Sequence, residues 1–248
     1  MRGFLVACQY LTVLPLAPRR GGPSDPGSAA PFFPLVGCLL GLILAGGDRL
    51  LTLILPPAVV AALLLAGWVL LTGGLHLDGL ADSADGLGGG WSRDESLAIM
   101  REPGVGAYGV AAVVLLLLLK ATTLAALDGP LRWRALLLAP TLGRLAPVLL
   151  ARLAPPARAE GQGQAFTLTV SAGGLGGATG FAIVLTLLLL WPWGAALLGW
   201  TFAFGWLASR YLTRRLGGVS GDLLGGAVEI TEGLVLLLVV ALGRLGAP

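Results

Sequence analysis

Three aspartates stand at close, regular spacing in the stretch His76-Leu-Asp78-Gly-Leu-Ala-Asp82-Ser-Ala-Asp85-Gly86. In a helix these aspartates fall at i, i+4 and i+7, so their carboxylates project from one face, with neighbours roughly 5–6 Å apart. Carboxylates this close raise each other's pKa unless a cation lies among them. Oxygen ligands in this arrangement are typical of Mg²⁺, which often bridges to phosphate. The stretch therefore predicts a magnesium site. The alternative is an ordinary helix face exposed to solvent. The surrounding glycines and the absence of lysines favour the magnesium site over this alternative.

A second polar cluster follows near the C-terminal end, where Leu216-Gly-Gly-Val-Ser-Gly221-Asp222-Leu-Leu-Gly-Gly226 precedes Glu229 and Glu232. As one helix, the three acids lie at i, i+7 and i+10 and form a single stripe. A carboxylate facing lipid at the centre of a membrane span costs about 2.5–3.5 kcal/mol, so these acids should face a polar interior or lie near the interface. Glycines such as Gly221 allow backbone N–H groups to approach a phosphate, although glycine also packs membrane helices without any ligand. The neighbouring acids favour the site.

Two single residues add to this pattern. The chain has fifteen arginines but one lysine, Lys120, which follows the apolar run from Val113 to Leu119. A compact ammonium at this place suits a point charge on a phosphate or a partner for a carboxylate; the alternative is a lysine that snorkels to the interface. His76 is the only histidine. It is a candidate base or phosphate ligand, or else an interfacial ring.

The composition sets the fold class that must position these residues. Mean hydropathy is +0.88, with 56% hydrophobic and 12% charged residues. Residues 50–75 and 165–209 carry no charge. These values predict an all-α, polytopic transmembrane helical bundle forming a single integral membrane domain over 1–248. Net charge is +3 with scattered basic residues, so a nucleic-acid partner is not expected. Membrane lipid is the expected surrounding.

Hydropathy predicts about seven spans, at roughly 33–54, 56–75, 104–127, 134–151, 170–190, 194–210 and 227–245. Residues 1–32 read as an uncleaved interfacial segment rather than a signal peptide, because Pro15, Pro18 and Arg19-Arg20 do not suit a cleavage site. With the N-terminus inside, the inner segments hold ten arginines and the outer ones four. This bias predicts active-site loops 76–103, 152–169 and 211–226 on the cytoplasmic side of the inner membrane.

Several motifs, taken in order, resemble the cobalamin synthase family (adenosylcobinamide-GDP ribazoletransferase). They are Phe33-Pro34-Leu-Val-Gly37, Thr72-Gly-Gly-Leu-His76-Leu-Asp78-Gly-Leu-Ala-Asp82-Ser-Ala-Asp85-Gly86, Ala98-Ile-Met-Arg101-Glu-Pro-Gly104-Val-Gly106-Ala-Tyr-Gly109, Lys120, Arg158-Ala-Glu160-Gly-Gln-Gly163, and Gly217-Gly-Val-Ser220-Gly-Asp222-Leu-Leu-Gly225 with Glu229 and Glu232. Together they cover nearly the whole chain. Two departures, Gly88-Gly-Gly90 and a serine at 220 where threonine is expected, remove no charged or metal-competent group.

The resemblance implies the last step of cobalamin nucleotide-loop assembly. Adenosylcobinamide-GDP and α-ribazole, or its 5′-phosphate, would give adenosylcobalamin, or its phosphate, and GMP. The resemblance also implies Mg²⁺ as cofactor. The implied metal ligands are Asp78, Asp82, Asp85 and Asp222. Substrate contacts are expected from Arg101, Gly104, Gly106, Lys120, Arg144, Gly221 and Asp222. Catalytic groups that orient or deprotonate the hydroxyl are expected among His76, Lys120, Glu229 and Glu232.

Three other functions fit part of the pattern. A membrane CDP-alcohol phosphotransferase or a polyprenyl transferase would also hold Mg²⁺ and diphosphate between acidic helices. The chain lacks the Ala-Arg that follows the first Asp-Gly pair in the former and the paired Asn/Asp motifs of the latter. A secondary transporter would also bury acids and a lysine, but with midplane placement and inverted repeats. No internal repeat is evident here.

Overall fold

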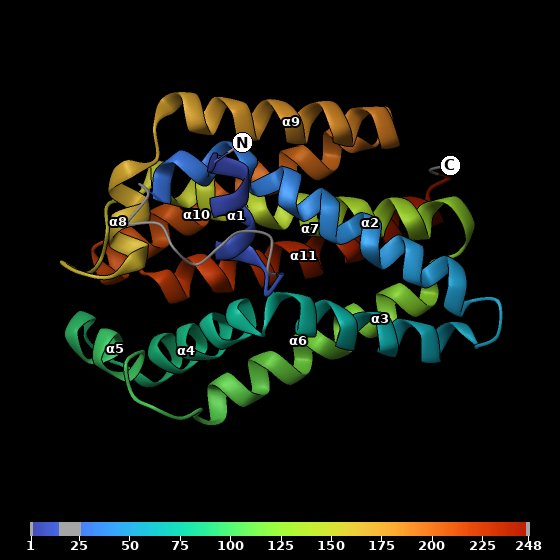
Figure 1. Ribbon diagram of the computed structural model, residues 1–248. Helices are drawn as coiled ribbons and strands as arrows, with labels where there is room; N and C mark the ends of the chain where they lie inside the picture. The colour runs from blue at the N-terminus through green and yellow to red at the C-terminus, as the bar shows by residue number, and fades with distance from the viewer. Residues whose placement is uncertain (1, 15–25, 247–248) are drawn as a thin grey trace.

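The computed structural model describes residues 2–14 and 26–246, which form a bundle of helices (Figure 1). Within these residues the order is α1 (Arg2–Leu11), η1 (Pro26–Phe32), α2 (Phe33–Leu51), α3 (Pro57–Thr72), α4 (Leu75–Gly89), α5 (Arg93–Ile99), α6 (Ala107–Ala126), α7 (Gly129–Leu153), α8 (Gln162–Thr169), α9 (Ala172–Leu190), α10 (Gly194–Leu216) and α11 (Gly221–Arg244). No strand is assigned in the described residues, and the predicted all-α class is confirmed. Pro15, Pro18, Arg19 and Arg20 lie outside them.

The chain is a multi-pass membrane protein. Five helical segments of the described chain are long and apolar enough to cross a membrane: η1 with α2, α6, α7, α9 and α11. The pair α3–α4 adds a sixth only as a segment bent by 90°. The seven predicted spans correspond to α2, α3, α6, α7, α9, α10 and α11, but α10 does not qualify. Its glycines, tryptophans and Arg210 lower the hydropathy of an otherwise sufficient length.

Helix α7 lies at the centre of the bundle, with 89% of its apolar window buried. Two glycines bring α2 against it. A Cβ at Gly41 would come within 2.6 Å of the Leu136 carbonyl oxygen, and a Cβ at Gly37 would overlap the backbone at Pro140. Close approach through small residues is a common way for membrane helices to pack. Gly37 of the motif Phe33-Pro34-Leu-Val-Gly37 thus serves this packing.

The turn between α3 and α4 depends on two consecutive glycines. Gly73 and Gly74 have φ of +64° and +70°, the left-handed region in which glycine alone is free of strain. The resulting 90° bend directs α4 away from the axis of α3 and against α11 and α6. At Gly79 an added Cβ would lie 2.7 Å from the Asp222 carbonyl oxygen. The two acidic helices therefore cross at backbone distance.

The three predicted loops gather at one end of the bundle, where α5 and α8 lie (left in Figure 1). They are mostly helical rather than irregular, which corrects the expected boundaries. Their glycines and polar residues lower hydropathy without preventing short helices; α5 begins with a Ser92–Glu95 capping box. Arg93 fastens α5 to its neighbours by donating to the carbonyls of Leu216 at 2.8 Å and Ala157 at 2.9 Å.

Candidate active site

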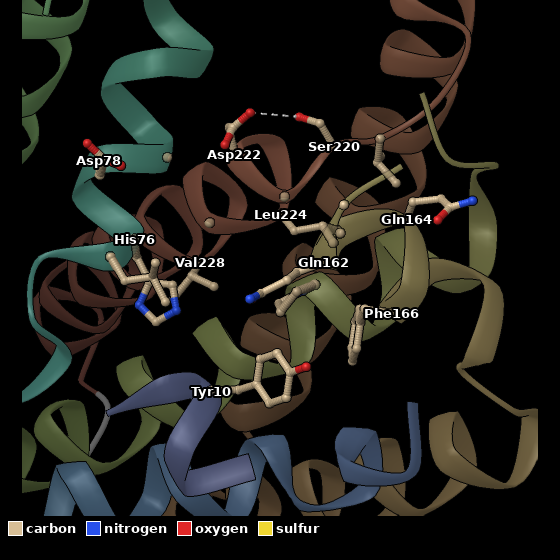
Figure 2. Close-up of a pocket in the computed structure, with 18 of the residues that line it drawn as sticks. Tyr10, His76, Asp78, Gln162, Gln164, Phe166, Ser220, Asp222, Leu224 and Val228 are labelled. Atoms are coloured by element: carbon tan, nitrogen blue, oxygen red, sulfur yellow. Dashed lines mark hydrogen bonds between the residues drawn. The ribbon is translucent and has the colours of Figure 1, made fainter. Parts of the chain in front are cut away.

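A cavity of about 310 Å³ opens at this end of the bundle (Figure 2). Its walls come from α1, the start of α2, the first turns of α4 and α11, and the segment 158–166. The residues used below are Tyr10, Phe33, His76, Asp78, Arg158, Glu160, Gln162, Phe166, Ser220, Asp222, Leu224 and Val228. The cavity therefore joins segments that are far apart in the sequence, including both acidic clusters.

Acids and one arginine form the upper part of the cavity. Asp78 on α4 and Asp222 on α11 lie on either side of the helix crossing (Figure 2). Arg158 Nη1 pairs with Asp222 Oδ2 at 3.0 Å, and the Ser220 hydroxyl donates to the same oxygen at 3.3 Å. Arg158 Nε is buried and has no hydrogen-bond partner in the described part of the chain. A second anion, such as a phosphate, would complete the hydrogen bonding of this guanidinium.

The pKa of Asp82, one turn beyond Asp78 on α4, reflects the charges around it. Asp82 lies beyond the 90° bend that separates α4 from α3, and α4 by itself is not a candidate membrane span. Burial raises the pKa of Asp82 to about 6, with further upward contributions from Asp78, Asp222 and Asp85 and an opposing one from Arg158. Asp78, Asp82 and Asp222 thus form a region of excess negative charge between α4 and α11.

Asp85 has other partners. Its carboxylate is buried and accepts the backbone N–H of Gly106, the residue before α6, at 2.7 Å, and that of Gly109, in the first turn of α6, at 2.8 Å. A carboxylate at a helix N-terminus satisfies unpaired N–H groups and the helix dipole. The sequence predicted Asp85 as a metal ligand and Gly106 as a substrate contact; the structure instead engages both in starting α6. A Cβ at Gly109 would overlap this carboxylate, which explains the glycine.

Four charged side chains pair in the interior, away from the cavity wall. Lys120 Nζ lies 2.5 Å from an oxygen of both Glu229 and Glu232, and Arg144 pairs with the other oxygen of Glu232. Lys120 also lies 4.9 Å above the Trp68 ring. All four are at most 5% exposed, and their charges sum to zero. We call them the buried ion cluster.

The contacts within the buried ion cluster differ from several of the roles that the sequence predicted for its members. Lys120 is a partner of carboxylates, one of the two predicted roles, and it does not snorkel, being 2% exposed. Lys120 and Arg144 do not line the cavity, and their positive charges are already balanced by glutamates. The expected phosphate contacts of these two cations, and the catalytic role of Glu229 and Glu232, therefore do not match their positions.

His76 lines the cavity and is also affected by the positive charges of the buried ion cluster. Its ring lines the cavity and is 4% exposed, yet Nδ1 has no hydrogen-bond partner among the described residues. Burial lowers the pKa of His76 well below its ordinary value, and Arg144 and Lys120 lower it further. The ring is therefore neutral, with one nitrogen able to donate and the other able to accept a hydrogen bond. Arg101 and Gly104, both predicted substrate contacts, are exposed beyond α5 and do not line the cavity.

Sequence reasoning missed four residues of the cavity: Arg158, Tyr10, Gln162 and Phe166. Arg158 and Gln162 lie in the polar run 158–164, which was noted only as part of a family motif. Gly163 in that run packs against the Gly221 backbone, which brings the run to α11. Tyr10 and Phe166 occur in apolar surroundings, where no pattern separates a cavity ring from an ordinary core ring.

Comparison with known proteins identifies the family. A sequence model of the family described as cobalamin-5-phosphate synthase matches residues 3–240. The chain belongs to this family. An adenosylcobinamide-GDP ribazoletransferase of Pseudomonas paraeruginosa is 45% identical over 239 residues, covering 96% of this chain and 97% of the relative. One of Geotalea daltonii is 40% identical over 244 residues, covering 98% of both chains.

The family match confirms the predicted cobalamin-biosynthesis transferase. It decides against the CDP-alcohol phosphotransferase, the polyprenyl transferase and the transporter. No solved structure matches this chain.

Proposed function

We propose that this chain joins adenosylcobinamide-GDP to α-ribazole or its 5′-phosphate, giving adenosylcobalamin or its phosphate and GMP. The observation that carries the proposal is the convergence of Asp78, Asp222, Arg158 and His76 on one cavity. A ribose hydroxyl of the acceptor forms a bond to the cobinamide-side phosphorus, and the bond from that phosphorus to GMP breaks. The hydroxyl proton leaves to a base, and the electron pair of the broken bond leaves with GMP.

Magnesium is the proposed cofactor, and one or two of Asp78, Asp82 and Asp222 would be its protein ligands. The donor set fits, because it consists of hard oxygen ligands with excess negative charge, as the raised pKa of Asp82 indicates. Among the described residues, no three acid, histidine or cysteine side chains are close enough to hold a metal by themselves. Mg²⁺ commonly takes one or two carboxylates and fills its other positions with phosphate oxygens and water. When bound, it would supply neutralisation of the diphosphate charge.

The remaining roles follow from position. The guanidinium of Arg158, which is oriented by its pairing with Asp222, is the proposed donor to a phosphate oxygen. His76, whose ring lines the cavity, is the proposed group that orients the hydroxyl or accepts its proton. Glu229, Glu232, Lys120 and Arg144 act as positioning residues that fix α6, α7 and α11 behind His76.

The proposed location is the cytoplasmic (inner) membrane, with the α5–α8 end and its cavity facing the cytoplasm. The excess of arginines in the segments predicted to face the cytoplasm, ten against four, supports this orientation.

The direct test uses the purified full chain in lipid nanodiscs with adenosylcobinamide-GDP, α-ribazole and Mg²⁺, with cobalamin followed by chromatography. We expect cobalamin to form only when all three are present. Failure of the well-folded protein to form cobalamin would overturn the proposal.

A further inference from the structure

We infer that the cavity is the binding site of the acceptor nucleoside, and that Tyr10 and Phe166 hold its flat, apolar base. This inference rests on the proposed function, because it assigns one of the two proposed substrates to the site. It also gives the N-terminal helix α1 a role in substrate recognition through Tyr10.

The size of the cavity selects between the two substrates. At about 310 Å³ it lies at the lower end of the range for small-molecule sites. A nucleoside is of this size, whereas a corrin ring carrying a nucleoside diphosphate is several times larger. The larger substrate can therefore present only its diphosphate to this site, at the acidic upper part.

The lower part of the cavity is suited to a flat ring. In Figure 2 the rings of Tyr10 and Phe166 lie on the side opposite Asp78 and Asp222. Phe166 is buried and stacks on Phe33, with centroids 5.0 Å apart and planes 9° from parallel, so its orientation is fixed. A nucleoside bound with its base between these rings would extend its ribose toward the acids.

The polar groups between the two parts match the edge of such a nucleoside. The side chain of Gln162 extends into the cavity between His76 and Tyr10 (Figure 2). Its amide N–H is able to donate to a ring nitrogen of the base. The ring of His76 lines the cavity on the wall nearer to Asp78, where the ribose hydroxyl would lie. Gln162 thus offers a donor to the base, and His76 offers an acceptor to the sugar.

The same walls disfavour guanine, the base of the leaving group. Guanine carries two donors and an acceptor on one edge, which lose hydrogen bonds with water on burial. The side chains of Leu224, Val228 and Phe166 cannot replace those bonds. The one carboxylate on the neighbouring segment, Glu160, is exposed. An apolar base with a single ring acceptor is therefore the better occupant.

The test is equilibrium binding of α-ribazole to the full chain in nanodiscs, measured by calorimetry with EDTA present so that the proposed metal site does not contribute. We expect Tyr10→Ala and Phe166→Ala each to weaken α-ribazole binding about tenfold or more, the loss that removal of one stacking ring typically causes. Tyr10→Phe, which keeps the ring, should restore affinity to within about threefold of the parent. Tyr211→Ala on α10, an exposed tyrosine away from the cavity, is the matched control.

The outcomes separate the inference from the proposed function. Unchanged α-ribazole affinity in both alanine variants, in a parent that forms cobalamin, overturns the inference and leaves the function intact. If the alanine substitutions weaken the binding of GMP but not that of α-ribazole, the cavity binds the leaving group, and the inference is overturned. A parent that binds α-ribazole with the expected variant effects but forms no cobalamin contradicts the proposed function alone.

Discussion

Removing the charge of Lys120 should destabilise the protein by leaving a glutamate uncompensated in the bundle interior. Lys120 and Arg144 balance Glu229 and Glu232 with nearly complete burial. Lys120→Met changes the charge of the buried ion cluster from zero to minus one. Breaking a buried ion pair typically costs about 3–5 kcal/mol, because the remaining charge has neither water nor a partner. We expect a loss of that size in the free energy of unfolding.

A second substitution should recover part of this loss. Glu229→Gln in the Lys120→Met background returns the cluster to zero charge and retains the Arg144–Glu232 pair. The double variant should therefore be more stable than Lys120→Met by about 1–3 kcal/mol, a coupling typical of residues in direct contact.

The assay is reversible unfolding by SDS in mixed micelles, followed by helical circular dichroism. Thr122→Met, an exposed change two residues along α6, controls for effects on the helix itself and should stay within about 0.5 kcal/mol of the parent. Additive losses in the double variant, or a Lys120→Met protein as stable as the parent, would refute the account of a charge-balanced cluster.

Three further predictions address the metal, the α6 cap and the topology. Mg²⁺ should raise the thermal midpoint more at pH 7 than at pH 5, because Asp82, with its pKa near 6, must lose its proton to bind metal. Asp82→Asn should abolish that difference and reduce turnover more than about tenfold, and an undiminished Mg²⁺ effect in this variant would argue against the ligand role. Asp85→Asn should cost about 1–3 kcal/mol of stability, because the amide cannot accept both N–H groups of α6, while the exposed Asp94→Asn costs little. A tenfold change in the Mg²⁺ concentration for half-maximal turnover would instead make Asp85 a ligand. Cysteines at Glu102 and Ala159, in a chain lacking Cys8 and Cys38, should be labelled only from the cytoplasm and one at Thr52 only from outside; labelling of the first two from opposite sides contradicts the single-face site.

Local patterns predicted the elements of the site well. The spacing of Asp78, Asp82 and Asp85 correctly predicted one helix, and that of Asp222, Glu229 and Glu232 another. Hydropathy correctly predicted a multi-pass helical protein. These inferences succeeded because helical periodicity and apolar length are properties of a continuous segment.

The failures concern contacts between distant segments. Asp85 caps a helix that begins more than twenty residues later, and Lys120 finds its glutamates more than a hundred residues away. A carboxylate that caps and one that binds metal are identical as sequence letters. The seventh span was overcounted because α10 has the length of a membrane span without its hydropathy. Tyr10 lines the cavity because of how α1 packs on the bundle, which the sequence of α1 does not show.

The most direct test of the central claim is isotope exchange between labelled GMP and adenosylcobinamide-GDP on the purified protein. The cavity offers acids, Arg158 and a histidine, which suit positioning and charge neutralisation for a single displacement by the acceptor hydroxyl. We expect no label to enter adenosylcobinamide-GDP while α-ribazole is absent, and GMP to appear one for one with cobalamin once it is added. Exchange of label without α-ribazole would contradict direct transfer and indicate a phosphorylated intermediate, with His76 as its carrier.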